Sequence, residues 1–97
     1  MTIVKNFTVK NVKGWHARPC AVIARTVAQH PNISVTFSCP QSDTTASGSS
    51  IFEMMVLAIN YGDTIIASLT GDDLEEINEL IESLQKIISK PYLNEDW

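Results

Sequence analysis

The stretch from residue 74 to residue 88, LEEINELIESLQKII, does more than any other segment to decide the fold. Its apolar side chains recur at intervals of three and four residues: Leu74, Ile77, Leu80, Ile81, Leu84, Ile87 and Ile88. This spacing predicts an amphipathic helix that must bury one face. Acidic residues crowd its start and lysines lie near its end, which complements the helix dipole. We therefore interpret the acidic run as a solvated, well-capped helix start rather than as a binding site.

Upstream of this helix the period changes to two, which predicts strands with one polar face. The segments with this alternation are residues 2–9, 33–38 and 64–69. The polar stretch 39–49, rich in Ser and Thr, has room for one more short strand around residues 43–46.

Two further helices are expected. The first runs from Ala17 to about His30, where the following Pro31 disfavours helical geometry. The second is short and apolar, covering residues 51–59. A serine opens it as N-cap, Ser49 or Ser50, and Gly62 suits a left-handed C-cap.

The order of elements is strand, helix, strand, short strand, short helix, strand, helix. In so small a chain this order predicts an α+β open-faced β-sandwich, with a four-stranded antiparallel sheet and three helices on one face. We expect one domain over residues 1–90, followed by a tail, residues 91–97, without periodicity.

Composition excludes several classes of function. The formal charge of −4 and the absence of Lys/Arg clusters argue against nucleic-acid binding. No apolar run is long enough to span a membrane, so no membrane insertion is expected. Cys20 and Cys39 are not spaced as metal ligands or as a disulfide framework, and they favour a reduced, cytoplasmic protein without a metal or other cofactor.

The residues 14–19, GWHARP, carry the chemistry. Gly14 supplies a turn and Pro19 suits the first turn of a helix, so His16 is expected at or beside a helix N-cap. A helix N-terminus offers unpaired N–H groups to an anion, and Arg18 adds a fixed positive charge. A neutral imidazole is a competent nucleophile. The set favours a histidine that is transiently phosphorylated, although a simple turn histidine remains an alternative on spacing alone.

Two motifs resemble those of one known family. GWHARPC is similar to the GLHARPA-type signature of the histidine-containing phosphocarrier (HPr) family of the bacterial phosphotransferase system. The segment from Ser50 to Met55 resembles that family's regulatory serine and the short partner-binding helix after it. The resemblance extends over about residues 2–88.

The resemblance implies a carrier, not an independent enzyme. His16 corresponds to the histidine that accepts phosphate on Nδ1 from the system's first enzyme, the phosphoenolpyruvate-protein phosphotransferase, and passes it to sugar-specific transporter components. Arg18 corresponds to the arginine that steadies the phosphate. Ser50 corresponds to the serine that a serine kinase/phosphorylase modifies. Residues in the positions that partners touch are Ile51, Phe52 and Met55. A monomer is expected.

This sequence departs from the family pattern at a few positions. Trp15 and Cys20 stand where Leu and Ala are usual, and both keep an apolar character. Glu53 places a carboxylate on the partner-binding helix, which bears on partner choice and on recognition by the kinase. Alternatives left open are a paralogous carrier in a regulatory, nitrogen-type chain and a regulatory binding module. An acylphosphatase-like hydrolase would need a Gly-rich phosphate loop, which the sequence lacks.

Overall fold

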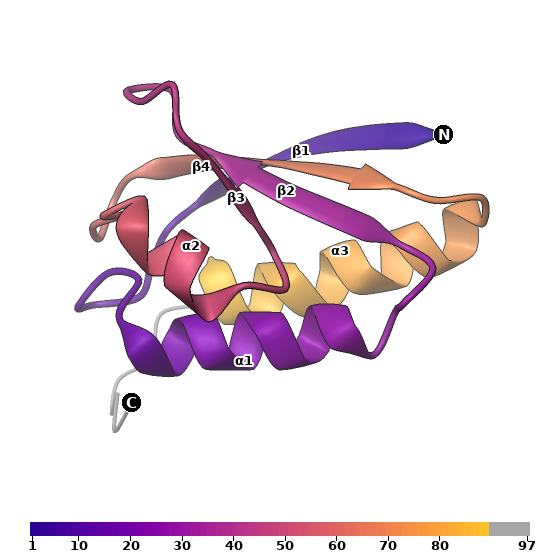
Figure 1. Cartoon of the computed structure of the whole chain (residues 1–97), viewed down its shortest axis with the longest axis horizontal. Coiled ribbons are helices and arrows are strands. Elements are labelled where there is room, and N and C mark those ends of the chain that lie inside the picture. Colours follow the sequence, from indigo (N-terminus) through magenta and orange to yellow (C-terminus); the bar gives the residue numbers. More distant parts are fainter. Residues whose placement is uncertain (90–97) are drawn as a thin grey trace.

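Three helices and four strands make up the computed structural model, which describes residues 1–89 (Figure 1). In chain order they are β1 (Thr2–Thr8), α1 (Ala17–Ala28), β2 (Ser34–Ser38), β3 (Thr45–Ser47), α2 (Ile51–Val56), β4 (Thr64–Thr70) and α3 (Leu74–Ile88). The expected domain boundary at residue 90 and the tail 91–97 lie outside the described residues.

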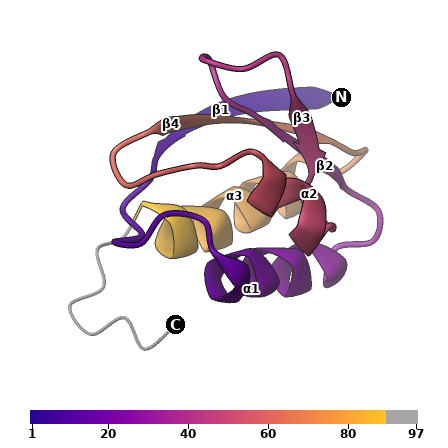
Figure 2. The ribbon, with the colours of Figure 1, turned by 60° about the vertical axis from the view of Figure 1, so that its left-hand side comes forward.

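The strands form one antiparallel sheet in the order β1-β4-β2-β3. Phe7 lies opposite Ile65 and Phe37 opposite Ala67, so their side chains share one face of the sheet. All three helices cover that face and leave the other open (Figures 1 and 2). The predicted open-faced sandwich is confirmed.

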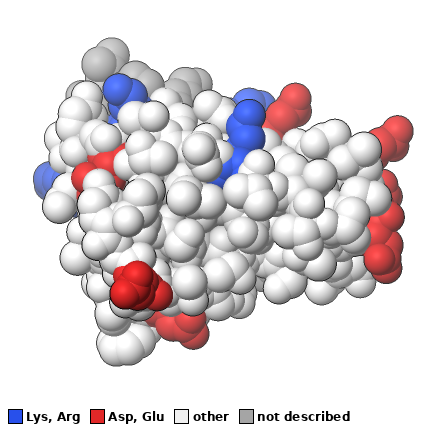
Figure 3. All heavy atoms as spheres, turned by 90° about the horizontal axis from the view of Figure 1, so that it is seen from above, with Lys and Arg blue, Asp and Glu red and all other residues white. Residues whose placement is uncertain are grey.

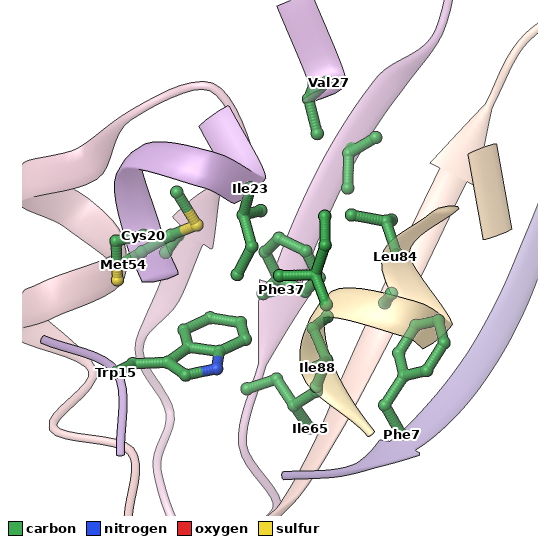
Figure 4. Close-up of a cluster of buried hydrophobic side chains, with 14 of the residues drawn as sticks. Phe7, Trp15, Cys20, Ile23, Val27, Phe37, Met54, Ile65, Leu84 and Ile88 are labelled. Carbon is green, nitrogen blue, oxygen red and sulfur yellow. The ribbon is translucent and has the colours of Figure 1, made fainter. Parts of the chain in front are cut away.

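The core lies between the sheet and the helices. Phe7, Phe37, Ile65 and Leu84 are almost fully buried there, and the side chains of Figure 4 come from all three helices and from the sheet. Burying side chains of this size contributes about 1.5–3 kcal/mol each. The fold is thus stabilised mainly by the apolar faces whose periodicity is visible in the sequence.

Helix α3 follows its prediction closely. Asp73 is its N-cap, with Oδ1 accepting from Glu75 N at 3.0 Å and from Glu76 N at 3.4 Å. The acidic start is therefore a cap, as the dipole argument predicted. Leu74 differs from the prediction, because 47% of it is exposed in the first turn instead of lying in the buried face.

Two boundaries were predicted wrongly. The short strand is Thr45–Ser47 and not residues 43–46, since Ala46 pairs with Phe37 and buries its side chain. Helix α2 ends at Val56 and not at residue 59. Ala58, with φ of 54°, makes the left-handed turn that was assigned to Gly62, which lies instead in the turn leading to β4.

The end of α1 is tied to the start of α3. The Nδ1 atom of His30, just after α1, lies 3.1 Å from Glu76 Oε2. The sequence gives no hint of this pair because 46 residues separate the two side chains. The pair joins two helices that both pack on the sheet.

The open face of the sheet is mostly uncharged, and acidic side chains gather toward its margins (Figure 3). Within residues 1–89, no helix is long and apolar enough to cross a bilayer.

Candidate functional site

His16 is the N-cap of α1, as predicted. Its backbone is extended, with φ of −91° and ψ of −172°, and its carbonyl accepts the first helical bond from Cys20 N at 3.2 Å. Its side chain makes no capping hydrogen bond. The ring nitrogen Nε2 is buried and has no hydrogen-bond partner. Nδ1 is therefore the ring nitrogen left for chemistry with another molecule.

Two unpaired backbone donors lie beside the imidazole. In the described chain, neither the Ala17 N–H nor the Arg18 N–H has a hydrogen-bond partner. Pro19 lacks an N–H, so it leaves the third position without a donor. The Arg18 side chain is exposed at the same helix start. An anion attached to His16 would therefore meet two unpaired amide groups at the helix start, and the exposed Arg18 side chain follows two residues on.

Trp15 anchors the histidine to the core. The residue is 4% exposed, and its ring meets the Phe37 ring edge-on, with centroids 5.1 Å apart. Its backbone N–H donates to Ile59 O at 3.0 Å, which ties the start of α1 to the segment after α2. The usual apolar packing at this position is thus kept by a larger ring (Figure 4).

Gly14 makes this close approach possible. Its φ is +70°, and a Cβ there would lie 2.3 Å from Ile59 O. No other residue type fits both the left-handed backbone and the short distance. The turn glycine noted in the sequence is therefore required by the contact that holds Trp15.

Asn11 is part of the site's support, and sequence reasoning missed it. It is 1% exposed, and its Nδ2 donates to Ile87 O at 3.0 Å. The neighbouring Lys10 N donates to Ile88 O at 2.8 Å. The loop before His16 is thus fixed to the C-terminal end of α3. An isolated Asn next to a turn carries no sequence signal for such a long-range bond.

Helix α2 presents an apolar patch next to this loop. The exposed fractions are 40% for Ile51, 76% for Phe52, 41% for Met55 and 57% for Val56, and we call these four residues the α2 patch. The fifth apolar side chain of the helix, Met54, is buried in the same apolar cluster as Cys20 of α1 (Figure 4). The structure thus exposes the three predicted partner-binding residues and adds Val56, which was not among them.

Ser50 is the N-cap of α2, and its Oγ accepts from Glu53 N at 3.1 Å. Glu53 reaches back in turn, with Oε1 accepting from Ser47 N at 2.9 Å. In a capping box the Glu side chain would accept from the N–H of the N-cap residue itself. Here it accepts from the N–H three residues earlier, because the Ser50 N–H is already bonded to Ser47 O. Ser50 and Glu53 therefore belong to one hydrogen-bonded unit.

Cys20 lies one turn beyond His16, on the inner side of α1. It is fully buried, and burial raises its pKa to about 11. A thiol in that state is protonated and poorly nucleophilic. Cys20 is thus a packing residue behind the site. Among residues 1–89 no group of three or more His, Cys, Asp or Glu side chains is placed to hold a metal ion.

The fold and the site define a class of protein. It is a small open-faced sandwich whose first helix begins at a histidine, and the side chain of that histidine makes no capping hydrogen bond. The family model described as the PTS HPr component phosphorylation site matches residues 3–89. The chain belongs to the HPr family.

Solved structures agree with this assignment. The phosphocarrier protein HPr from Bacillus anthracis is 25% identical, with a TM-score of 0.76 over 91% of this chain and 98% of that one. HPr-C-His from Thermoanaerobacter tengcongensis is 26% identical, with a TM-score of 0.72 over 88% and 93% of the two chains. The histidine-containing phosphocarrier protein of Mycoplasma shares the fold at 21% identity, with a TM-score of 0.73 over 87% and 92%. No curated protein matches the chain.

Proposed function

We propose that this chain carries a phosphoryl group on His16 Nδ1, accepting it from the phosphoenolpyruvate-dependent first enzyme and passing it to sugar-specific transporter components. The observation that carries the proposal is the start of α1. There a histidine with one buried ring nitrogen adjoins two unpaired N–H groups and an exposed arginine.

The transfer needs no cofactor. The lone pair of Nδ1 attacks phosphorus, the new N–P bond forms, and the bond between phosphorus and the donor breaks with its electron pair remaining on the donor. The same step in reverse, with a different partner, releases the group. Because two partners must each complete a half-reaction, the chain is a carrier and not an independent enzyme.

The number of hydrogen-bond donors at the start of α1 determines how tightly the phosphoryl group is held. The Ala17 and Arg18 N–H groups and the Arg18 guanidinium can bind phosphoryl oxygens, each as a charge-assisted contact. Pro19 removes what would be a further donor at the helix start. A site that binds the phosphoryl group with moderate strength suits a carrier, because the group must be held after one partner leaves and released to the next.

Several finer points belong to this proposal. We infer that the chain works in the cytoplasm as a monomer, and that the α2 patch is the surface on which partners dock. Exposed apolar side chains in such numbers on six residues are unusual without a binding role. Ser50 would be the target of a serine kinase/phosphorylase, whose phosphate adds negative charge beside that patch.

The test is incubation with phosphoenolpyruvate and a purified first enzyme of the phosphotransferase system, followed by intact mass measurement. The native chain should gain one phosphate that is labile in acid, and His16→Ala should gain none. A native chain left unmodified by an enzyme that phosphorylates another carrier would refute the proposal. Offering the phosphorylated chain to sugar-type and nitrogen-type acceptors then separates the main role from the paralogous one.

A further inference from the structure

Glu53 is the one charged residue of α2, and it lies on the exposed side of the helix beside the α2 patch. Phe52 precedes it, and Val56, three residues on, is its neighbour on the helix surface. Any protein that covers the α2 patch therefore also covers or borders this carboxylate. A buried or bordering charge must be met by an opposite charge, since otherwise its desolvation opposes binding.

The Glu53 carboxylate is held in place through one of its two oxygens. Oε1 accepts from Ser47 N at 2.9 Å, and the backbone N–H of Glu53 donates to Ser50 Oγ. Within residues 1–89, Oε2 accepts no hydrogen bond and Glu53 forms no salt bridge. A fixed carboxylate with one free oxygen is preorganised to accept a hydrogen bond from a cation, because little side-chain entropy remains to be lost.

The helices α1 and α2 carry charges of opposite sign. Helix α1 contributes Arg18 and Arg25, both exposed, whereas α2 contributes only the Glu53 carboxylate. Helix α1 therefore carries only positive charges, whereas α2 carries the apolar patch and one negative charge. A complementary partner carries acidic groups opposite α1 and a basic group opposite α2.

We propose that Glu53 determines partner specificity: the docking surface of the cognate first enzyme places a Lys or Arg side chain against Glu53 Oε2. This inference rests on the proposed function, because it concerns the partners of the same transfer. It assigns to Glu53 a role distinct from the cap, since the cap uses Oε1 and the partner uses Oε2.

The test is the second-order rate constant for phosphorylation by the first enzyme encoded in the same genome, measured for native chain, Glu53→Gln and Glu53→Lys. Gln keeps an oxygen to accept from Ser47 N–H, so the cap stays while the charge is lost. Glu79→Gln is the matched control, because it removes one exposed carboxylate from α3.

At low salt we expect Glu53→Gln to lower the rate constant by roughly three- to tenfold, and Glu53→Lys to lower it further. The effect should lie in KM rather than kcat, and it should shrink at roughly 0.5 M salt, where exposed charges are screened. The control should equal the native chain.

A Glu53→Gln rate equal to or above the native rate would overturn the inference and leave the proposed function standing. Equal losses for Glu53→Gln and the Glu79→Gln control would also overturn it, since net charge alone would then account for the effect. A native chain that accepts no phosphate would overturn both.

Discussion

Replacing Gly14 with alanine tests how the loop before His16 is built. The substitution places a Cβ on a residue with φ of +70° and 2.3 Å from Ile59 O. The left-handed backbone costs a non-glycine residue about 1–2 kcal/mol. The clash is with backbone and not with a flexible side chain, so the loop must shift and the Trp15–Ile59 bond is lost or stretched, which costs about 1 kcal/mol more. Repacking of Trp15 adds about 1–3 kcal/mol.

Together these terms predict that Gly14→Ala lowers the free energy of unfolding by about 4 kcal/mol. Gly62→Ala is a matched control, because its φ is +90° but no atom lies within 4 Å of the new Cβ. That variant should lose only the backbone term, about 1–2 kcal/mol. Urea unfolding of both variants gives the two values, and a domain of this size should melt about 15–30 °C lower with Gly14→Ala.

Equal destabilisation by the two glycine variants would refute the reasoning, because it would mean that the contact with Ile59 costs nothing. A large loss with unchanged phosphorylation of the folded fraction would separate the loop's stability from its role in placing His16.

Three smaller predictions concern the supports of the site. Asn11→Ala should lower the free energy of unfolding by about 1–3 kcal/mol, since it leaves Ile87 O buried without its donor; urea unfolding measures this, and no change would contradict the bond's role. Ser50→Ala should cost about 1 kcal/mol through loss of the α2 cap, whereas Ser50→Thr should cost clearly less. Burial raises the pKa of Cys20 to about 11. The folded state then keeps its proton while the unfolded state loses it, so stability should decline as pH rises from about 9 to 11, and Cys20→Ala should show a shallower decline in unfolding experiments across that window.

The sequence predicts most of this fold because each element carries its own periodicity. The α3 stripe, the alternation in the strands, the acidic start of α3 and a serine N-cap for α2 are local signals, and the structure has all of them. The errors lie where tertiary contacts override local preference. Helix α2 stops early, at Val56, and leaves Ile59 O to bond with Trp15, a pairing of residues 44 positions apart that no local pattern records.

The candidate site divides in the same way. Its chemistry, His16 with Arg18 at a helix start, could be read from six consecutive residues. The contacts that hold the site in place could not be predicted from the sequence, because Asn11 bonds to α3 and Gly14 is constrained by Ile59. The family resemblance assigns partner contacts to Ile51, Phe52 and Met55. The structure exposes all three, while docking itself stays a prediction.

The most direct measurement of the central claim is the position of the phosphate on the ring. Long-range ¹H–¹⁵N NMR of the ¹⁵N-labelled, phosphorylated chain distinguishes the two ring nitrogens of each histidine. Because Nε2 of His16 is buried and Nδ1 of His30 is engaged with Glu76, the account predicts phosphate on His16 Nδ1 alone, with His30 unchanged. Phosphate on His16 Nε2 or on His30 would contradict it.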